Sequence, residues 1–178
     1  MNKLIIAILL CCSLQAAAQV RSVTFTASGL TCSMCSRAIY KALDQVAFVK
    51  DINADVEKSV YTVTIKDGMQ ASPDAVKKAV EAAGFSIASM SITAELNNVT
   101  LHNDAHISID GNTYHMLNVP NEVLNGAQTL TIVDKNYLPA AKRKKYGKYT
   151  QMPCFETGVA STCCHGNSAG QRIYHVTI

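Results

Sequence analysis

The sequence predicts an α+β fold in which a βαββαβ domain precedes a small β-rich domain. In the first half, apolar residues alternate with polar ones in some segments and recur at three- and four-residue steps in others. This mixture of strand and helix patterns ends at about residue 93, and mainly strand patterns follow. The chain has 178 residues, 48% of them hydrophobic, which suits one domain of ordinary size or two small ones. We therefore expect one domain at residues 22–93 and another at residues 99–178.

The first strand and the first helix of this scheme meet at a pair of cysteines. Residues 23–27 alternate between apolar and polar side chains, as in a half-buried strand, and Gly29 ends the segment. Apolar residues at helical spacing then predict a helix that begins at the cysteines. They are Cys35, Ala38, Ile39, Ala42, Leu43 and Val46.

Two strands come next, at residues 48–53 and 60–65, and the turn signal Asp67-Gly68 closes the second of them. Each is short enough for a half-buried strand of a small sheet.

A second helix and a last strand complete the first domain. Ser72 as the cap and Pro73 at the first helical position predict a helix that ends at Gly84, where a left-handed residue is wanted. Residues 85–92 then form a strand. The resulting order is the ferredoxin-like arrangement, in which two helices cover one face of an antiparallel sheet.

The remaining residues predict mainly strands. Residues 94–98 are polar and without a strong period, as expected of a linker. Asp110-Gly111-Asn112 is a hairpin signal, and a short helix is expected at residues 139–149. We expect a small β-rich domain, in the form of a partly open barrel. Its strands are expected at residues 105–109, 113–117, 129–133 and 173–178.

The first 18 residues have the pattern of a signal peptide. Lys3 gives a positive start, residues 4–14 are apolar, and residues 16–18 supply the small side chains that a signal peptidase needs. The apolar run is shorter than the roughly 20 residues of a membrane-spanning helix. We therefore expect residues 1–18 to be cleaved and the mature chain to be periplasmic or otherwise exported, with no stable membrane span.

A lipid-anchored form through Cys11 or Cys12 is the weaker alternative, because Leu10 is bulky where such sites usually have a small residue. Cleavage leaves an odd number of cysteines, so at least one thiol lies outside any intramolecular disulfide. Thiols kept outside the cytoplasm usually have a redox or metal role. The cysteines of the mature chain are Cys32, Cys35, Cys154, Cys163 and Cys164.

Cys32 and Cys35 lie where the first strand gives way to the first helix, so both sulfurs are expected to point at a common spot. Backbone N–H groups at a helix N-terminus favour the thiolate, which is the form that binds metal. Two thiolates with no histidine or carboxylate nearby in sequence form a soft site that suits Cu(I) and also Hg(II). Zn(II) is less suited, because it normally takes four ligands.

These residues resemble the heavy-metal-associated domain of copper chaperones, copper-pumping ATPases and the periplasmic mercury-binding protein, over about residues 22–93. The family's Gly-Met-Thr-Cys-x-x-Cys corresponds to residues 29–35, with Leu30 in place of the usual Met, and its Ala-Gly-Tyr/Phe corresponds to residues 83–85. The resemblance implies that Leu30 changes the support of the loop rather than its ligands. It also implies that Phe85 packs beneath the metal loop.

The expected function is therefore non-enzymatic: an exported protein that captures Cu(I), or another thiophilic ion such as Hg(II), and passes it on or holds it. Transfer would proceed by ligand exchange, with Cys32 meeting the ion first and Cys35 completing the pair. The partner would be a metal transporter or a metal-accepting protein. A periplasmic thiol–disulfide oxidoreductase is the alternative from another class, and a structural disulfide is a third reading. The oxidoreductase lacks its expected context, notably any Trp and a cis-proline candidate.

A second group of possible ligands lies near the C-terminus, in and before a Gly/Ser-rich stretch. It could hold a disulfide from Cys154 to Cys163 or Cys164, or a second soft-metal site formed by Cys163, Cys164 and His165, with or without Cys154. Elsewhere, His106 and His115 flank the predicted hairpin and could approach each other across it. Singly, these two and the remaining histidines, His102 and His175, read as ordinary surface or half-buried residues.

The charge of the chain argues against nucleic acid as a partner. The formal net charge is only +3, and the one dense basic run, at residues 142–145, reads as a solvated helix face. We therefore expect no nucleic-acid binding.

Overall fold

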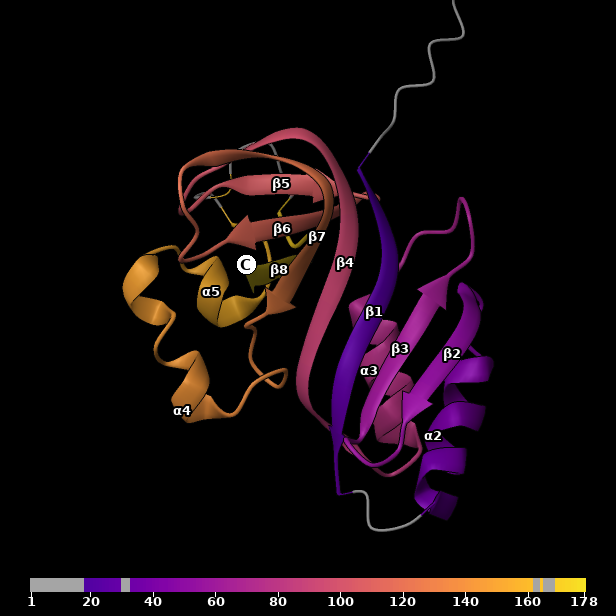
Figure 1. Ribbon diagram of the computed structural model, residues 1–178. Helices are drawn as coiled ribbons and strands as arrows, with labels where there is room; N and C mark the ends of the chain where they lie inside the picture. Colours follow the sequence, from indigo (N-terminus) through magenta and orange to yellow (C-terminus); the bar gives the residue numbers. More distant parts are fainter. Residues whose placement is uncertain (1–17, 30–32, 162–163, 165–168) are drawn as a thin grey trace, which may run out of the picture.

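The computed structural model describes residues 18–29, 33–161, 164 and 169–178. The first 17 residues of the expected signal peptide lie outside this part. The described strands form one sheet in the order β2-β3-β1-β4-β7-β8-β6-β5 (Figure 1). No helix of the described residues is long and apolar enough to cross a membrane.

The N-terminal half has the predicted ferredoxin-like order. β1 lies between β3 and β4 and is antiparallel to both, and β2 completes this half at the sheet edge. The helices α2 and α3 contact each other and pack beside these strands (Figure 1). The bounds are β1 Gln19–Ser28, α2 Ser33–Asp44, β2 Val49–Asp55, β3 Val60–Ile65, α3 Pro73–Ala82 and β4 Ser86–Leu101.

The capping signals predicted for α3 are confirmed. The hydroxyl of Ser72 accepts a hydrogen bond from the backbone N–H of Ala75, at 3.2 Å, and Pro73 is the first helical residue. Gly84 has a φ of 88°, the left-handed conformation that glycine adopts without a steric cost. The chain therefore leaves α3 in the direction of β4.

β4 is much longer than predicted. Residues 94–98, expected to be a linker, lie inside β4, which pairs with β1 over its first part and with β7 up to Leu101. A bulge between Leu96 and Val99 interrupts the second pairing. In Figure 1 this strand arches from the N-terminal half into the C-terminal half. The strands of the two expected domains thus belong to one sheet, and their division into separate domains stays a prediction.

The C-terminal strands extend the sheet. The hairpin predicted at Asp110-Gly111 is confirmed, since both residues have positive φ and β5 pairs with β6 across the turn. β8 is antiparallel to β7 and parallel to β6. The bounds are β5 His106–Ile109, β6 Asn112–Met116, β7 Glu122–Ile132 and β8 Ile173–Thr177.

The helices of this half are short. The single helix expected at residues 139–149 is instead α4, Ala140–Arg143, followed by a 3-10 turn, η1, at Gly147–Tyr149. A further helix that was not predicted, α5, spans Cys154–Thr157.

One hydrophobic core runs through both halves of the sheet. It contains Phe25 and Tyr61 from the first half, and Tyr114 and Val176 from the second, all almost fully buried. Burial of this apolar area supplies the main driving force for folding. Apolar side chains of the two halves therefore pack against one another in a single core.

Candidate metal centre

Cys35 lies in the first turn of α2, as predicted for one ligand of the thiolate pair. The residue is partly exposed, and the neighbouring Met34 is 80% exposed. Cys32, the other predicted ligand, lies outside the described residues, as does Leu30. Gly29, the last described residue before the loop, has a φ of 85°, a conformation that requires glycine for an unstrained turn after β1.

A buried hydrogen bond fixes the start of α2 against the sheet. The hydroxyl of Tyr61, on β3, donates to the hydroxyl of Ser36 at 2.8 Å, and both residues are buried. The Tyr61 ring stacks on that of Phe25, with ring centres 5.1 Å apart. Because Ser36 follows Cys35 directly, this bond positions the helical turn that carries the thiol.

Phe85 packs against the core from a partly buried position between α3 and β4. Its expected place beneath the metal loop stays a prediction, because residues 30–32 of that loop are outside the described part of the chain.

The second predicted group is described only in part. Cys154 and Cys164 are both buried and pack in one small apolar cluster, but no disulfide joins them to each other. Cys163 and His165 lie outside the described residues, so a bridge from Cys154 to Cys163 and a site with His165 stay predictions.

The histidines are brought together more closely than the sequence indicated. His106 on β5 pairs with His115 on β6, and their rings stack with centres 4.4 Å apart. His115 in turn pairs with His175 on β8, and those ring centres are 4.9 Å apart. The approach of His106 to His115 across the hairpin is therefore confirmed, and a third histidine joins them. His102 is exposed.

Cys154 lies against this row of histidines. Its Sγ is 3.7 Å from Nδ1 of His115. His106, His115 and Cys154 each offer one possible ligand atom, and these three atoms lie within 4.8 Å of one another. Within the described part of the chain, these residues form a group that could hold a metal ion. We call these three residues the His₂Cys cluster.

Two carboxylates orient the central and outer histidines. Asp104 lies 2.9 Å from Nε2 of His115, and Asp134 lies 2.6 Å from Nδ1 of His175. A carboxylate only accepts hydrogen bonds, so each of these ring nitrogens carries the proton and donates it. The lone pair of His115 is therefore on Nδ1, the atom that faces Cys154.

The electrostatics favour neutral imidazoles in the cluster. Burial and the neighbouring His175 and His106 lower the pKa of His115 to about 4, although Asp104 acts in the opposite direction. Burial and His175 also lower the pKa of His106. Both rings are then neutral at neutral pH, which is the form that binds a metal ion.

Sequence reasoning missed Cys154 as a neighbour of these histidines. The expectation that His115 and His175 are surface or half-buried residues is wrong, because both are fully buried. The pairing of His106 with His115 follows from the hairpin signal. The parallel pairing of β6 with β8 joins segments some 60 residues apart, and α5 is too short to show a helical period. No local pattern in the chain carries either piece of information.

Comparison with protein families identifies one domain, in the N-terminal half of the chain. Residues 24–86 match the family model of the heavy-metal-associated domain. No curated protein matches the chain. Part of this chain is similar to three solved structures: CopP from Helicobacter pylori, the yeast copper transporter domain Ccc2a and the N-terminal domain of PacS from Synechocystis.

Each of these likenesses covers little more than a third of this chain. CopP is 29% identical over 37% of this chain and 97% of its own. Ccc2a is 26% identical over 36% of this chain and 88% of its own. The PacS domain is 21% identical over 38% of this chain and 92% of its own. The TM-score is 0.33 in each case. The family match spans β1 to the start of β4 and includes both Cys32 and Cys35. Residues 24–86 of this chain are therefore a heavy-metal-associated domain.

Proposed function

We propose that the chain is an exported metal-binding protein that captures Cu(I) through Cys32 and Cys35 and transfers or sequesters it. The observation that carries this proposal is the match of residues 24–86 to the heavy-metal-associated domain, which contains both cysteines. The position of Cys35 in the first turn of α2 supports it, since backbone N–H groups at a helix N-terminus favour the thiolate.

Two thiolates account for the choice of ion. Cu(I) accepts a low coordination number and prefers soft sulfur ligands. Hg(II) shares these preferences and is the alternative cargo. The acceptor would be a metal transporter or another metal-binding protein, which takes the ion by exchanging thiolates one at a time.

The experiment is a competition titration of reduced mature protein with Cu(I) and a Cu(I) chelator. We expect tight binding of about one Cu(I) per cysteine pair, and loss of this site in Cys32→Ser/Cys35→Ser. A further variant also replaces Cys154, Cys163 and Cys164 by Ser. Tight stoichiometric binding by this fully substituted variant would refute the thiolate assignment.

The rival function, thiol–disulfide exchange, uses the same two cysteines, so substitution alone does not separate the two. An oxidoreductase must turn over, whereas a carrier needs reduced thiols and leaves them chemically unchanged. We expect negligible insulin reduction by metal-free protein, together with rapid Cu(I) transfer to a chelator. Catalytic turnover at rates typical of thioredoxin-like proteins, with weak Cu(I) binding, would favour the oxidoreductase.

A further inference from the structure

The C-terminal half contains a group of side chains that the proposed carrier function does not use. His106, His115 and Cys154 come from β5, β6 and α5, and their ligand atoms converge within 4.8 Å. Buried polar groups are normally satisfied by hydrogen bonds, yet Nε2 of His106 is buried and has no hydrogen-bond partner among the described residues. A bound ligand would account for this convergence.

We propose that the His₂Cys cluster is a second metal site, which binds one copper or zinc ion through two imidazoles and one thiolate. Both ions take this mixture of nitrogen and sulfur donors, whereas Mg²⁺ and Ca²⁺ prefer oxygen. Three protein ligands leave a further coordination position open.

The spacing of the donor atoms fits such an ion. Typical bonds to zinc are about 2.0 Å from nitrogen and about 2.3 Å from sulfur, and at these lengths the observed separation of 3.7 Å between Nδ1 of His115 and Sγ of Cys154 corresponds to an angle of about 120°. This value is close to that of a trigonal or tetrahedral site. Little movement of these two side chains would be needed.

The central ligand is already oriented. Asp104 accepts a hydrogen bond from Nε2 of His115, which leaves Nδ1 directed at Cys154. A carboxylate on the outer nitrogen of a metal-binding histidine is a common arrangement, and it fixes the tautomer and the ring orientation.

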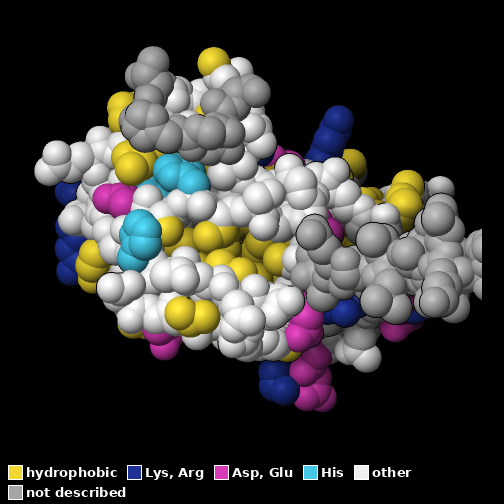
Figure 2. All heavy atoms as spheres, turned by 90° about the horizontal axis from the view of Figure 1, so that it is seen from above, with side chains coloured by type: hydrophobic (Ala, Val, Ile, Leu, Met, Phe, Trp, Pro, Cys, Tyr) yellow, Lys and Arg dark blue, Asp and Glu magenta, His cyan; other side chains and the backbone are white. Residues whose placement is uncertain are grey.

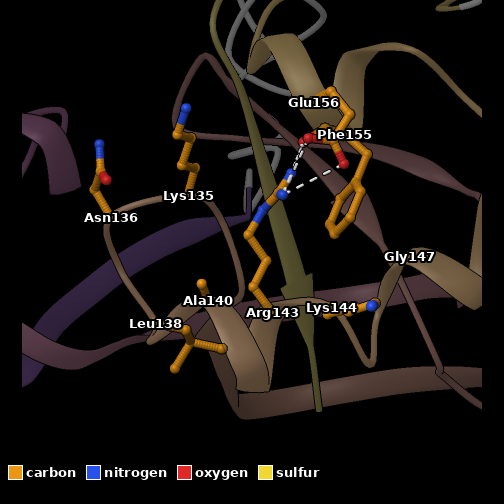
Figure 3. Close-up of a pocket in the computed structure, with 9 residues that line it drawn as sticks. All are labelled: Lys135, Asn136, Leu138, Ala140, Arg143, Lys144, Gly147, Phe155 and Glu156. Atoms are coloured by element: carbon orange, nitrogen blue, oxygen red, sulfur yellow. Dashed lines mark hydrogen bonds and ion pairs between the residues drawn. The ribbon is translucent and has the colours of Figure 1, made fainter.

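The thiol is also held in place. Arg143, from α4, makes an ion pair with Glu156 and donates to the backbone carbonyl of Phe155, and its guanidinium lies over the Phe155 ring (Figure 3). The Phe155 ring packs edge-on against His175. These contacts fix α5, and with it Cys154, against the histidine strands. Arg143 was expected on a solvated face, but its side chain is only 13% exposed, because α5 covers it.

The His₂Cys cluster lies close to the molecular surface. His106 is partly exposed, and Figure 2 shows histidine side chains at two places on the face seen from above. A surface hollow of about 470 Å³ also lies beside the cluster, lined by Asp104 and by Met152 and Pro153, which precede Cys154. Met152 brings a soft thioether group to the lining of this hollow.

The test uses the full mature chain with the substitutions Cys32→Ser/Cys35→Ser, in reduced form and without oxygen. The first site is then absent, so the result does not depend on whether Cys32 and Cys35 bind Cu(I). The probe is Co²⁺, which reports on zinc-type sites by its spectrum. We expect one Co²⁺ per chain, a sulfur-to-cobalt charge-transfer band, and loss of this band on addition of Zn²⁺. A parallel titration with Cu(I) and a chelator determines which ion the site prefers, and a preference for either one supports the proposal.

Cys154→Ser in this background should abolish the charge-transfer band, and His115→Asn should weaken Co²⁺ binding by at least about tenfold. His102→Asn is the matched control, since this exposed histidine lies outside the cluster and its loss should change nothing. Cys154→Ser changes one atom, so it keeps the test valid if the buried His115→Asn variant fails to fold. No stoichiometric uptake by the background variant, or an unchanged band in Cys154→Ser, would overturn the proposal.

Discussion

Tyr61 connects the helix that carries Cys35 to the centre of the sheet. Its ring is fully buried and stacked on Phe25, and its hydroxyl donates to Ser36 near the N-terminal end of α2. A buried tyrosine hydroxyl normally needs such a partner, because desolvation without a hydrogen bond is costly. The bond therefore stabilises the fold and sets the position of the first turn of α2.

Tyr61→Phe should lower the free energy of unfolding by about 1 kcal/mol, because it removes one buried hydrogen bond and leaves the Ser36 hydroxyl without this donor. Urea unfolding of the mature chain measures the effect. Tyr40→Phe is the control, since Tyr40 is 43% exposed and should give no change. Equal stability of Tyr61→Phe and the unchanged protein would show that the bond contributes nothing.

At the scale of secondary-structure elements, one arginine links α3 to β8. Arg172 makes ion pairs with Asp74 in the first turn of α3 and with Asp134, both at 2.8 Å. Asp134 in turn accepts from His175, and the Tyr137 hydroxyl donates to Asp74. This network joins the heavy-metal-associated domain to the strands that carry the histidines.

Asp74 should make stability depend on pH in the acid range. Burial raises the pKa of this carboxyl, but hydrogen bonds from Arg172 and Tyr137 outweigh burial, and the pKa is below its usual value. A carboxyl with a lowered pKa stabilises the fold above its unfolded pKa, about 3.9, and this contribution is lost as the pH falls through the folded pKa.

The melting temperatures of the unchanged protein and Asp74→Asn, measured from neutral pH to about pH 3, test this dependence. We expect the unchanged protein to be the more stable at neutral pH, and the difference to shrink at the acid end. Asp51→Asn, at an exposed position, is the control and should follow the unchanged protein. A difference that stays constant over the whole range would contradict the assigned role of Asp74.

Local signals account for most elements of the first half and fewer of the second. β3 was predicted at its observed bounds, and the Ser72 cap fixed the start of α3, because strand alternation and capping depend on neighbouring residues. The length of β4 was missed, since its second part gains its strand conformation from pairing with β7. The cysteine pair was likewise readable from a local motif, whereas the His₂Cys cluster depends on pairings between distant segments.

At the scale of the whole molecule, the heavy-metal-associated domain and the C-terminal strands share a sheet and a core. β4 is the strand that both halves use, and core residues such as Leu101 and Tyr174 pack in the same cluster as Val23 and Val76. Loss of the C-terminal half would expose apolar surface and one edge of β4. The six elements of the first half nevertheless form a closed ferredoxin-like unit.

A chain truncated to residues 19–96 should therefore fold cooperatively, but melt at a lower temperature than the mature protein. Thermal unfolding followed by circular dichroism measures both properties. The absence of a cooperative transition would show that the first half depends on the C-terminal strands for folding.

The most direct test of the proposed function is metal analysis of the mature protein, purified without oxygen from its native cell envelope. Recovery from the envelope also tests the proposed export. The account predicts copper at about one ion per Cys32/Cys35 pair, and one copper ion fewer per chain in the Cys32→Ser/Cys35→Ser variant expressed in the same cells. Protein recovered from the envelope without copper or another thiophilic ion, and with the cysteine pair oxidised to a disulfide, would contradict the carrier function.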